Sequence, residues 1–175
     1  MLAETHWKKL GAYLKETQIL GSIQNTLYWD QNTGMPKKGA SWRSEQLTYI
    51  AKNLHKRNSS EEFFNLIQSA KNELLDSGQN SNNQLFNKDK ERNINLLMRE
   101  FNREKNLDPQ LVESLAKAKS KGYESWQEAK KKSDFRIFLP FFEELVKLRI
   151  EEAKQISDQY SPWETLAQPF EPELT

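Results

Sequence analysis

The sequence predicts an all-α protein, and two observations support that prediction. Apolar residues recur three or four positions apart along most of the 175 residues, which is the spacing of one buried helix face. No segment shows the strict apolar and polar alternation of a half-buried strand. Because the expected connections are short, we predict about six helices in an antiparallel bundle-like array, followed by an extended, proline-rich C-terminal tail.

A proline separates the first two predicted helices. The first begins near Trp7 and ends before Pro36, because proline disfavours helical geometry in the residue that precedes it. The second begins between residues 39 and 41 and extends to about Arg57. Its apolar face is marked by Leu47, Ile50 and Leu54.

Capping signals mark several later helices. Ser59 and Glu62 have the spacing of a capping box, which predicts the start of a third helix there. Asp108 followed by Pro109 is typical of a helix start, since the aspartate caps free amides and the proline needs no hydrogen bond. In that fifth helix, Gly122 permits close contact with a neighbouring helix. The remaining boundaries are expected near Gly78, Asn87, Asn106, Lys132, Pro140 and Ser157, and Ser133 or Asp134 is expected to cap the last helix.

We expect residues 1–175 to form a single helical domain with two less regular segments. Residues 77–86 are predicted to be a mobile loop, because the stretch SGQNSNNQ at its start has nothing apolar to bury. Residues 157–175 are predicted to be an extended tail. This tail is too apolar for a solvated terminus, so we expect it to pack on these helices or on a surface outside the chain. Its apolar residues are Tyr160, Trp163, Leu166 and Phe170.

Composition argues against several classes of protein. Lys and Arg number 26 against 25 Asp and Glu, which gives a net charge of +1 and no cation excess for nucleic acid binding. The absence of cysteine excludes disulfides and thiolate chemistry in this chain. No stretch approaches the ~20 apolar residues of a membrane span, and residues 1–9 lack the apolar run of a signal peptide. We therefore expect a cytoplasmic protein with no membrane or nucleic acid partner.

No catalytic or metal-ligating residue is expected in this chain. Zinc hydrolases hold their metal with clustered histidines and carboxylates, whereas His6 and His55 lie far apart in the sequence and without carboxylates at helical spacing. We expect each of these histidines to be either hydrogen-bonded within the fold or exposed at the surface. The carboxylate pairs Glu143–Glu144 and Glu151–Glu152 are adjacent in sequence and therefore point to different helix faces.

One stretch combines aromatic, amide and charged residues around the first proline. Two interpretations remain open: these residues form the wall of a binding groove, or they are structural. In the structural interpretation, which helical aromatic patterns favour, Trp29 and Met35 lie in the core, and Asp30 caps a turn or pairs with Arg43. The candidate wall residues are Trp29, Asp30, Gln31, Met35, Pro36, Arg43 and Gln46.

The segment Leu27–His55, LYWDQNTGMPKKGASWRSEQLTYIAKNLH, resembles the N-terminal signature of the carboxypeptidase Taq family of zinc peptidases. In that family Trp-Asp-Gln, Met-Pro, an arginine and Glu-Gln-Leu recur in this order. Further stretches resemble the same family in the same order, so the resemblance covers nearly the whole chain. They are Leu107–Ala118, Tyr123–Phe138, Phe138–Glu144 and Phe170–Thr175.

The resemblance implies a largely helical, commonly homodimeric, metal-dependent exopeptidase that removes C-terminal residues from peptides. Its zinc is held by a His-Glu-x-x-His helix and a third ligand, and none of these has a matching position here. The chain is therefore expected to correspond to the first third of such an enzyme, to bind no zinc itself and to be inactive alone. Its expected partner is the missing catalytic portion or a second copy, with peptide bound only in the complete enzyme.

A second interpretation comes from another class of protein. The apolar tail around Trp163 and Phe170 is also consistent with a free-standing helical interaction module that descends from a truncated peptidase. A segment cut from a larger fold should expose the surface that its missing partner covered, so we also predict an apolar patch near the tail and self-association of the chain.

Overall fold

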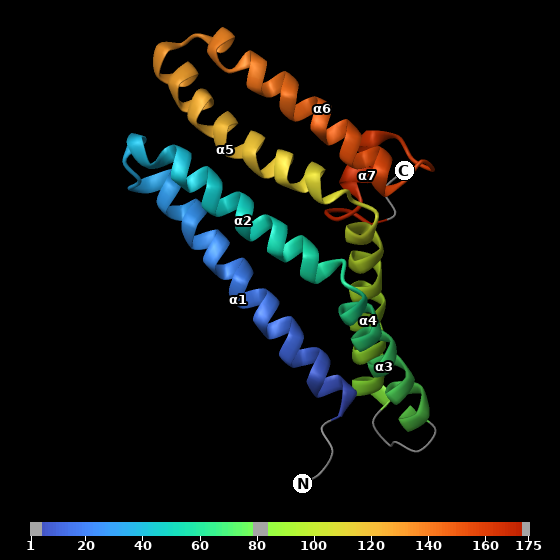
Figure 1. Cartoon of the computed structure of the whole chain (residues 1–175). Helices are drawn as coiled ribbons and strands as arrows, with labels where there is room; N and C mark the ends of the chain where they lie inside the picture. Colours follow the sequence, from blue (N-terminus) through green and yellow to red (C-terminus); the bar gives the residue numbers. More distant parts are fainter. Residues whose placement is uncertain (1–4, 79–83, 173–175) are drawn as a thin grey trace. The chain divides into compact units, whose positions relative to one another are not determined.

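The computed structural model describes residues 5–78 and 84–172, and this part of the chain contains helices and no strand (Figure 1). The all-α prediction is therefore confirmed. The α-helices are α1 (His6–Thr33), α2 (Ala40–Asn58), α3 (Glu61–Gly78), α4 (Gln84–Lys105), α5 (Pro109–Lys132), α6 (Leu139–Ile156) and α7 (Pro162–Ala167). Two short 3-10 helices are η1 (Lys37–Gly39) and η2 (Phe135–Ile137).

The capping predictions hold at one helix and need correction at two. Asp108 caps α5, since its side chain accepts a hydrogen bond from the amide of Gln110. The cap of α3 is Ser60 rather than Ser59, because Ser60 Oγ accepts from the Phe63 amide at 3.1 Å. Asp134 caps η2 rather than the last long helix.

The two segments that were expected to be irregular differ in how far the structure tests them. Helix α3 includes Gly78 and α4 begins at Gln84, and the intervening part of the predicted loop 77–86 lies outside the described residues. Within the predicted tail, 157–175, the structure adds the short helix α7. Its start is fixed by a reciprocal capping box between Ser161 and Glu164 and by Pro162 in the first turn.

Contacts group the chain into two compact units, Met1–Ser22 with Leu54–Lys105 and Ile23–Asn53 with Asn106–Thr175. The expectation of one domain over 1–175 stays a prediction. In the first unit the start of α1, α3 and α4 share one apolar core. Its buried residues are Leu10, Tyr13, Phe63, Ile67, Ala70, Ile94 and Phe101.

Polar contacts complete the first unit. The Tyr13 hydroxyl donates to the Arg57 carbonyl at 2.9 Å, and the Arg57 guanidinium lies 4.1 Å from the centre of the Tyr13 ring. His55 is buried and its Nδ1 lies 2.9 Å from Glu104 Oε2. The interpretation of His55 as a satisfied structural histidine is therefore confirmed.

The second unit is built on the hairpin of α5 and α6, which lie side by side and antiparallel (Figure 1). Leu107, Leu111 and Leu115 form its buried apolar cluster. The predicted close contact at Gly122 is confirmed, because a Cβ atom there would lie 3.1 Å from Leu145 Cδ1. None of the described helices is both long enough and apolar enough to cross a membrane.

Candidate functional site

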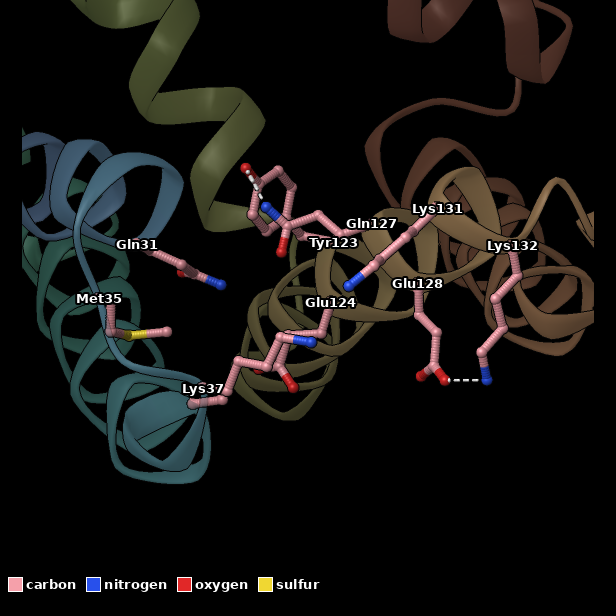
Figure 2. A pocket seen from close by; sticks show the side chains of 10 residues that line it. Gln31, Met35, Lys37, Tyr123, Glu124, Gln127, Glu128, Lys131 and Lys132 are labelled. Carbon is pink, nitrogen blue, oxygen red and sulfur yellow. Dashed lines mark hydrogen bonds and ion pairs between the residues drawn. The ribbon is translucent and has the colours of Figure 1, made fainter.

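A cavity of about 540 Å³ lies in the second unit, between the α1–α2 turn and α5 (Figure 2). One wall comes from the end of α1, η1 and the first residue of α2, and the other comes from the second half of α5. The lining residues are Gln31, Met35, Lys37, Ala40, Tyr123, Glu124, Gln127, Glu128, Lys131 and Lys132. The volume is in the range of small-molecule binding sites.

Gln31 is the most deeply buried polar residue of the cavity wall. The residue is 6% exposed, and its Nε2 donates to Ser120 Oγ at 3.4 Å. The Oε1 atom is buried without a hydrogen-bond partner in the described part of the chain. Figure 2 shows the amide directed from α1 toward the α5 side of the cavity. A buried acceptor left without a donor is costly, so this oxygen is a destabilising feature of the wall.

The α5 wall is a polar stripe along one helix face. Tyr123, Glu124, Gln127 and Lys131 are separated by steps of one, three and four residues, so they lie on neighbouring parts of that face. The Tyr123 hydroxyl accepts a hydrogen bond from Gln127 Nε2 at 2.9 Å. This bond orients both side chains at the cavity edge (Figure 2).

The two glutamates of the cavity differ in their electrostatic surroundings. Burial raises the pKa of Glu124 above its ordinary value, and nearby Lys121 opposes that shift. The hydrogen bond from Lys132 lowers the pKa of Glu128, and the two charged groups lie 2.6 Å apart. With Lys132 paired in this way, Lys37 and Lys131 are the other cations that line the cavity.

The seven candidate wall residues divide into two groups. Gln31 and Met35 line the cavity, whereas the other five do not. Trp29 is 67% exposed, so the interpretation that placed it in the core is wrong. Pro36 is also exposed. The groove-wall role of the seven residues remains a prediction.

Asp30, Arg43 and Gln46 form a polar cluster beside the cavity. Arg43 donates from Nη2 to Asp30 Oδ2 at 2.5 Å, from Nη1 to the Leu27 carbonyl at 2.5 Å, and from Nε to Gln46 Oε1 at 3.0 Å. The predicted pairing of Asp30 with Arg43 is therefore present. These bonds hold the end of α1 against the start of α2, which positions Gln31 in the cavity wall.

The sequence reasoning missed the α5 half of the cavity. Glu124, Gln127 and Lys131 are not among the candidate residues that the sequence indicates. The available signal was the polar stripe from Ser120 to Lys131 at helical steps. That signal identifies one face of the helix, but it does not identify the other segment of the chain that packs against this face.

No metal centre is found in the part of the chain that the structure describes. Across 5–78 and 84–172, no three side chains among His, Asp and Glu are grouped so as to hold a metal ion. The donor set of a zinc peptidase site, with clustered histidines and a carboxylate, is therefore not matched by these residues.

Comparison with known proteins identifies the family. The sequence matches the carboxypeptidase Taq (M32) metallopeptidases over residues 9–175. The chain belongs to this family. The chain is 27% identical to thermostable carboxypeptidase 1 of Thermus thermophilus over 154 residues, which are 88% of the chain and 29% of that protein. It is 25% identical to carboxypeptidase 1 of Bacillus subtilis over 175 residues, which are 100% of the chain and 33% of that protein.

Solved structures of other proteins have the same fold as this carboxypeptidase Taq chain. The crystal structure of BsuCP matches 98% of the chain with a TM-score of 0.84 and 24% identity, over 33% of its own length. Trypanosoma cruzi metallocarboxypeptidase 1 matches 97% of the chain with a TM-score of 0.69 and 25% identity, over 32% of its length. The chain thus spans about a third of the length of the relatives that it matches.

Proposed function

We propose that this chain is the N-terminal helical segment of a metal-dependent carboxypeptidase and that it does not hydrolyse peptides by itself. The observation that supports the proposal is the family match over residues 9–175, combined with coverage of only 29% to 33% of the curated relatives. In the complete enzyme the metal is proposed to be zinc, held by residues outside this chain. A cytoplasmic location stays a prediction of the sequence.

We propose that this segment contributes to the shape of the complete enzyme and offers a surface that the catalytic portion covers. An apolar stripe on α6 is exposed, with Leu139, Phe142, Val146 and Ile150 each 37% to 44% exposed. Steps of three and four residues place them on one helix face. In the tail, Trp163 and Phe170 are 67% and 90% exposed. We propose that the catalytic portion covers the α6 stripe and that the isolated chain associates with itself when that portion is missing.

The same exposed stripe favours a second candidate function. A free-standing helical module that binds another protein would also present an apolar helix face rimmed by charged residues. In that case the natural form of the protein would carry out no peptide hydrolysis, and a partner would copurify with it from its source cells.

The purified chain provides the test. We expect no release of C-terminal amino acids from a peptide, and substoichiometric zinc by elemental analysis, under conditions where the Thermus thermophilus carboxypeptidase is assayed as a reference. Peptide hydrolysis together with one bound zinc per chain would overturn the proposal. The intact mass of the native protein then separates the two candidates, since a species much heavier than 20.6 kDa identifies the chain as part of a longer enzyme.

Light scattering tests the proposed role of the α6 stripe. We expect self-association of the wild-type chain, and we expect Val146→Glu to reduce it because the substitution places a charge in the stripe. Lys147→Glu is the matched control, since it changes charge at the next, exposed position. A dispersed wild-type monomer, or equal effects of the two substitutions, would contradict that role.

A further inference from the structure

We propose that an apolar groove between α1 and α4 binds an amphipathic helix of another protein, one whose polar flanks are acidic. This α1–α4 groove lies in the first compact unit, where the start of α1 packs beside α4 (Figure 1). It shares no residue with the cavity at Gln31 or with the α6 stripe. The proposal goes beyond the proposed function, because it concerns a different surface and requires neither a metal nor peptide hydrolysis.

The α1–α4 groove has a volume of about 350 Å³, and most of its lining is apolar. Leu10 is buried at its base, whereas Leu96 is 42% exposed at its edge. An apolar hollow that is open to solvent marks a contact surface for another molecule. The lining residues are Trp7, Leu10, Gly11 and Leu14 of α1 and Asn93, Leu96 and Leu97 of α4.

The walls of the α1–α4 groove have the form that a third helix requires. On each of the two helices the lining residues recur at steps of one, three or four positions, which is the spacing of a single helix face. An amphipathic helix binds in such a groove through apolar residues at i, i+3, i+4 and i+7. A Cβ atom at Gly11 would meet nothing within 4 Å, so an apolar side chain of the partner finds space there.

Cationic side chains border the α1–α4 groove along α4. A shallower hollow of about 390 Å³ adjoins the groove at Leu96, which lines both. Its cations are Lys88, Arg92 and Arg99, and none of them forms an ion pair within residues 5–78 and 84–172. In addition, Lys90 Nζ lies 5.1 Å from the centre of the Trp7 ring, so a further cation stands where Trp7 lines the groove.

Two lysines extend this basic border to the α1 side of the groove. Lys8 and Lys15 are exposed and lie three and four residues from Gly11, which places them on the same side of the helix. Glu73 is also close to this end of α1, but its carboxylate already accepts a hydrogen bond from the Trp7 amide at 3.0 Å. Both walls of the groove therefore carry cations at their rims.

The distribution of charge selects an acidic helix from the possible occupants. Lys88, Arg92 and Arg99 are spread along α4 over about 16 Å at 1.5 Å per residue, so a ligand with a single carboxylate, such as a fatty acid, reaches only part of them. Carboxylates repeated along a helix reach all three. In the described part of the chain, Glu91 is the one carboxylate that lines either hollow, so a basic helix would meet mainly like charges.

Titration of the purified chain with a synthetic peptide tests the proposal. The probe is a fluorescein-labelled helix of about four turns, ~14 residues, with leucine along one face and glutamate on both flanks. By fluorescence anisotropy we expect a dissociation constant at or below ~0.1 mM, which rises with salt concentration because salt screens the contacts to the basic border. The control peptide carries lysine in place of every glutamate and is expected to bind at least about tenfold more weakly.

Substitutions at two glycines of α1 place the peptide in the α1–α4 groove. Gly11→Glu is expected to weaken binding about tenfold, because it adds both bulk and negative charge to the groove. Gly21→Glu is the matched control, since a Cβ atom at Gly21 also meets nothing within 4 Å and Gly21 does not line the groove. Val146→Glu alters the α6 stripe and is expected to leave binding unchanged. Thermal melts of the variants identify any loss of folding.

A variant of the basic border provides an independent test. Arg92→Met combined with Arg99→Met is expected to weaken binding of the acidic peptide about tenfold and to reduce its salt dependence. Arg136→Met removes an exposed arginine of the other compact unit and is expected to change neither quantity.

Several outcomes would overturn the proposal. They are equal binding of the acidic and basic peptides, equal effects of Gly11→Glu and Gly21→Glu, loss of binding in Val146→Glu, and binding of dodecanoate without binding of the acidic peptide. If the native protein is a longer enzyme that does not bind the peptide, the rest of that enzyme covers the groove, and another protein is excluded as the occupant. None of these results bears on the proposed function, which is tested separately by peptide hydrolysis, zinc content and native mass.

Discussion

Arg43 binds Asp30 across the turn that joins α1 to α2, with Nη2 and Oδ2 2.5 Å apart. The side chain of Arg43 is 12% exposed and that of Asp30 is 43% exposed, so this ion pair is partly shielded from water. The same guanidinium also binds the Leu27 carbonyl and Gln46 Oε1. One arginine therefore links both helices of the turn that carries Gln31 and Met35 into the cavity wall.

Replacement of Arg43 is expected to destabilise the fold. Arg43→Met removes three hydrogen bonds from a charged donor and leaves Asp30 unpaired, so we expect the free energy of unfolding in urea to fall by about 2 kcal/mol. Arg136→Met is the control, because Arg136 pairs with Asp134 in the same way but is 87% exposed. The control is expected to change stability by less than about 0.5 kcal/mol. Equal losses in the two variants would show that Arg43 is not a structural link.

The sequence offered the Asp30–Arg43 pair as one of two structural roles for Asp30, because both residues flank a turn that Pro36 marks. It did not allow the exposure of Trp29 to be predicted. Helix α1 also exposes Ile19 and Ile23, so its apolar residues occupy more than one face. A periodic pattern of that kind does not identify the buried face, because burial depends on which neighbouring helix packs there.

The cavity was harder to predict from the sequence than the helices were. Helix boundaries follow from local signals such as Asp108 with Pro109, which act within a few residues. The cavity instead combines Gln31 with residues about ninety positions later, such as Tyr123 and Glu124. Only the packing of α1 and α2 against α5 brings them together, and no local propensity encodes that packing.

Gly122 is expected to tolerate no larger side chain. A Cβ atom at this position would lie 3.1 Å from Leu145 Cδ1, and the two further methyl groups of valine would crowd the α5–α6 contact. We expect Gly122→Val to lower the free energy of unfolding by about 1–3 kcal/mol. Gly11→Val is the control in another helix, since nothing lies within 4 Å of a Cβ atom there. Comparable melting temperatures for the two variants would contradict close packing at Gly122.

The Tyr13 hydroxyl is expected to stabilise the first unit. Tyr13→Phe keeps the stacked contact with Phe63, whose ring centre lies 5.4 Å away, but removes the hydrogen bond to the Arg57 carbonyl. We expect a loss of about 1 kcal/mol in urea unfolding, the net value of one hydrogen bond. Tyr49→Phe makes the same change at a residue that is 70% exposed, and its stability should stay at the wild-type value. A loss at Tyr49 as large as that at Tyr13 would refute the role of the buried hydroxyl.

The two cavity glutamates are expected to contribute to stability with opposite signs. Burial raises the pKa of Glu124 above its ordinary value of 4.5, so the folded state binds its proton more tightly than the unfolded state does. Stability therefore falls as pH rises from 4.5 through the raised pKa of Glu124. Because Gln carries no charge, Glu124→Gln should be more stable than the wild type at pH 7, and this difference should disappear below pH 4.5.

Glu128→Gln is expected to have the opposite effect at the same helix face. The hydrogen bond from Lys132 lowers the pKa of Glu128 below 4.5, so the ion pair stabilises the fold above that pH and is lost as pH falls through the lowered pKa. Glu128→Gln should thus be slightly less stable than the wild type at pH 7 and equal to it in acid. Urea unfolding of both variants between pH 3 and pH 8 measures the two differences. The same sign for both variants at pH 7 would show that burial at Glu124 and pairing at Glu128 do not govern these carboxylates.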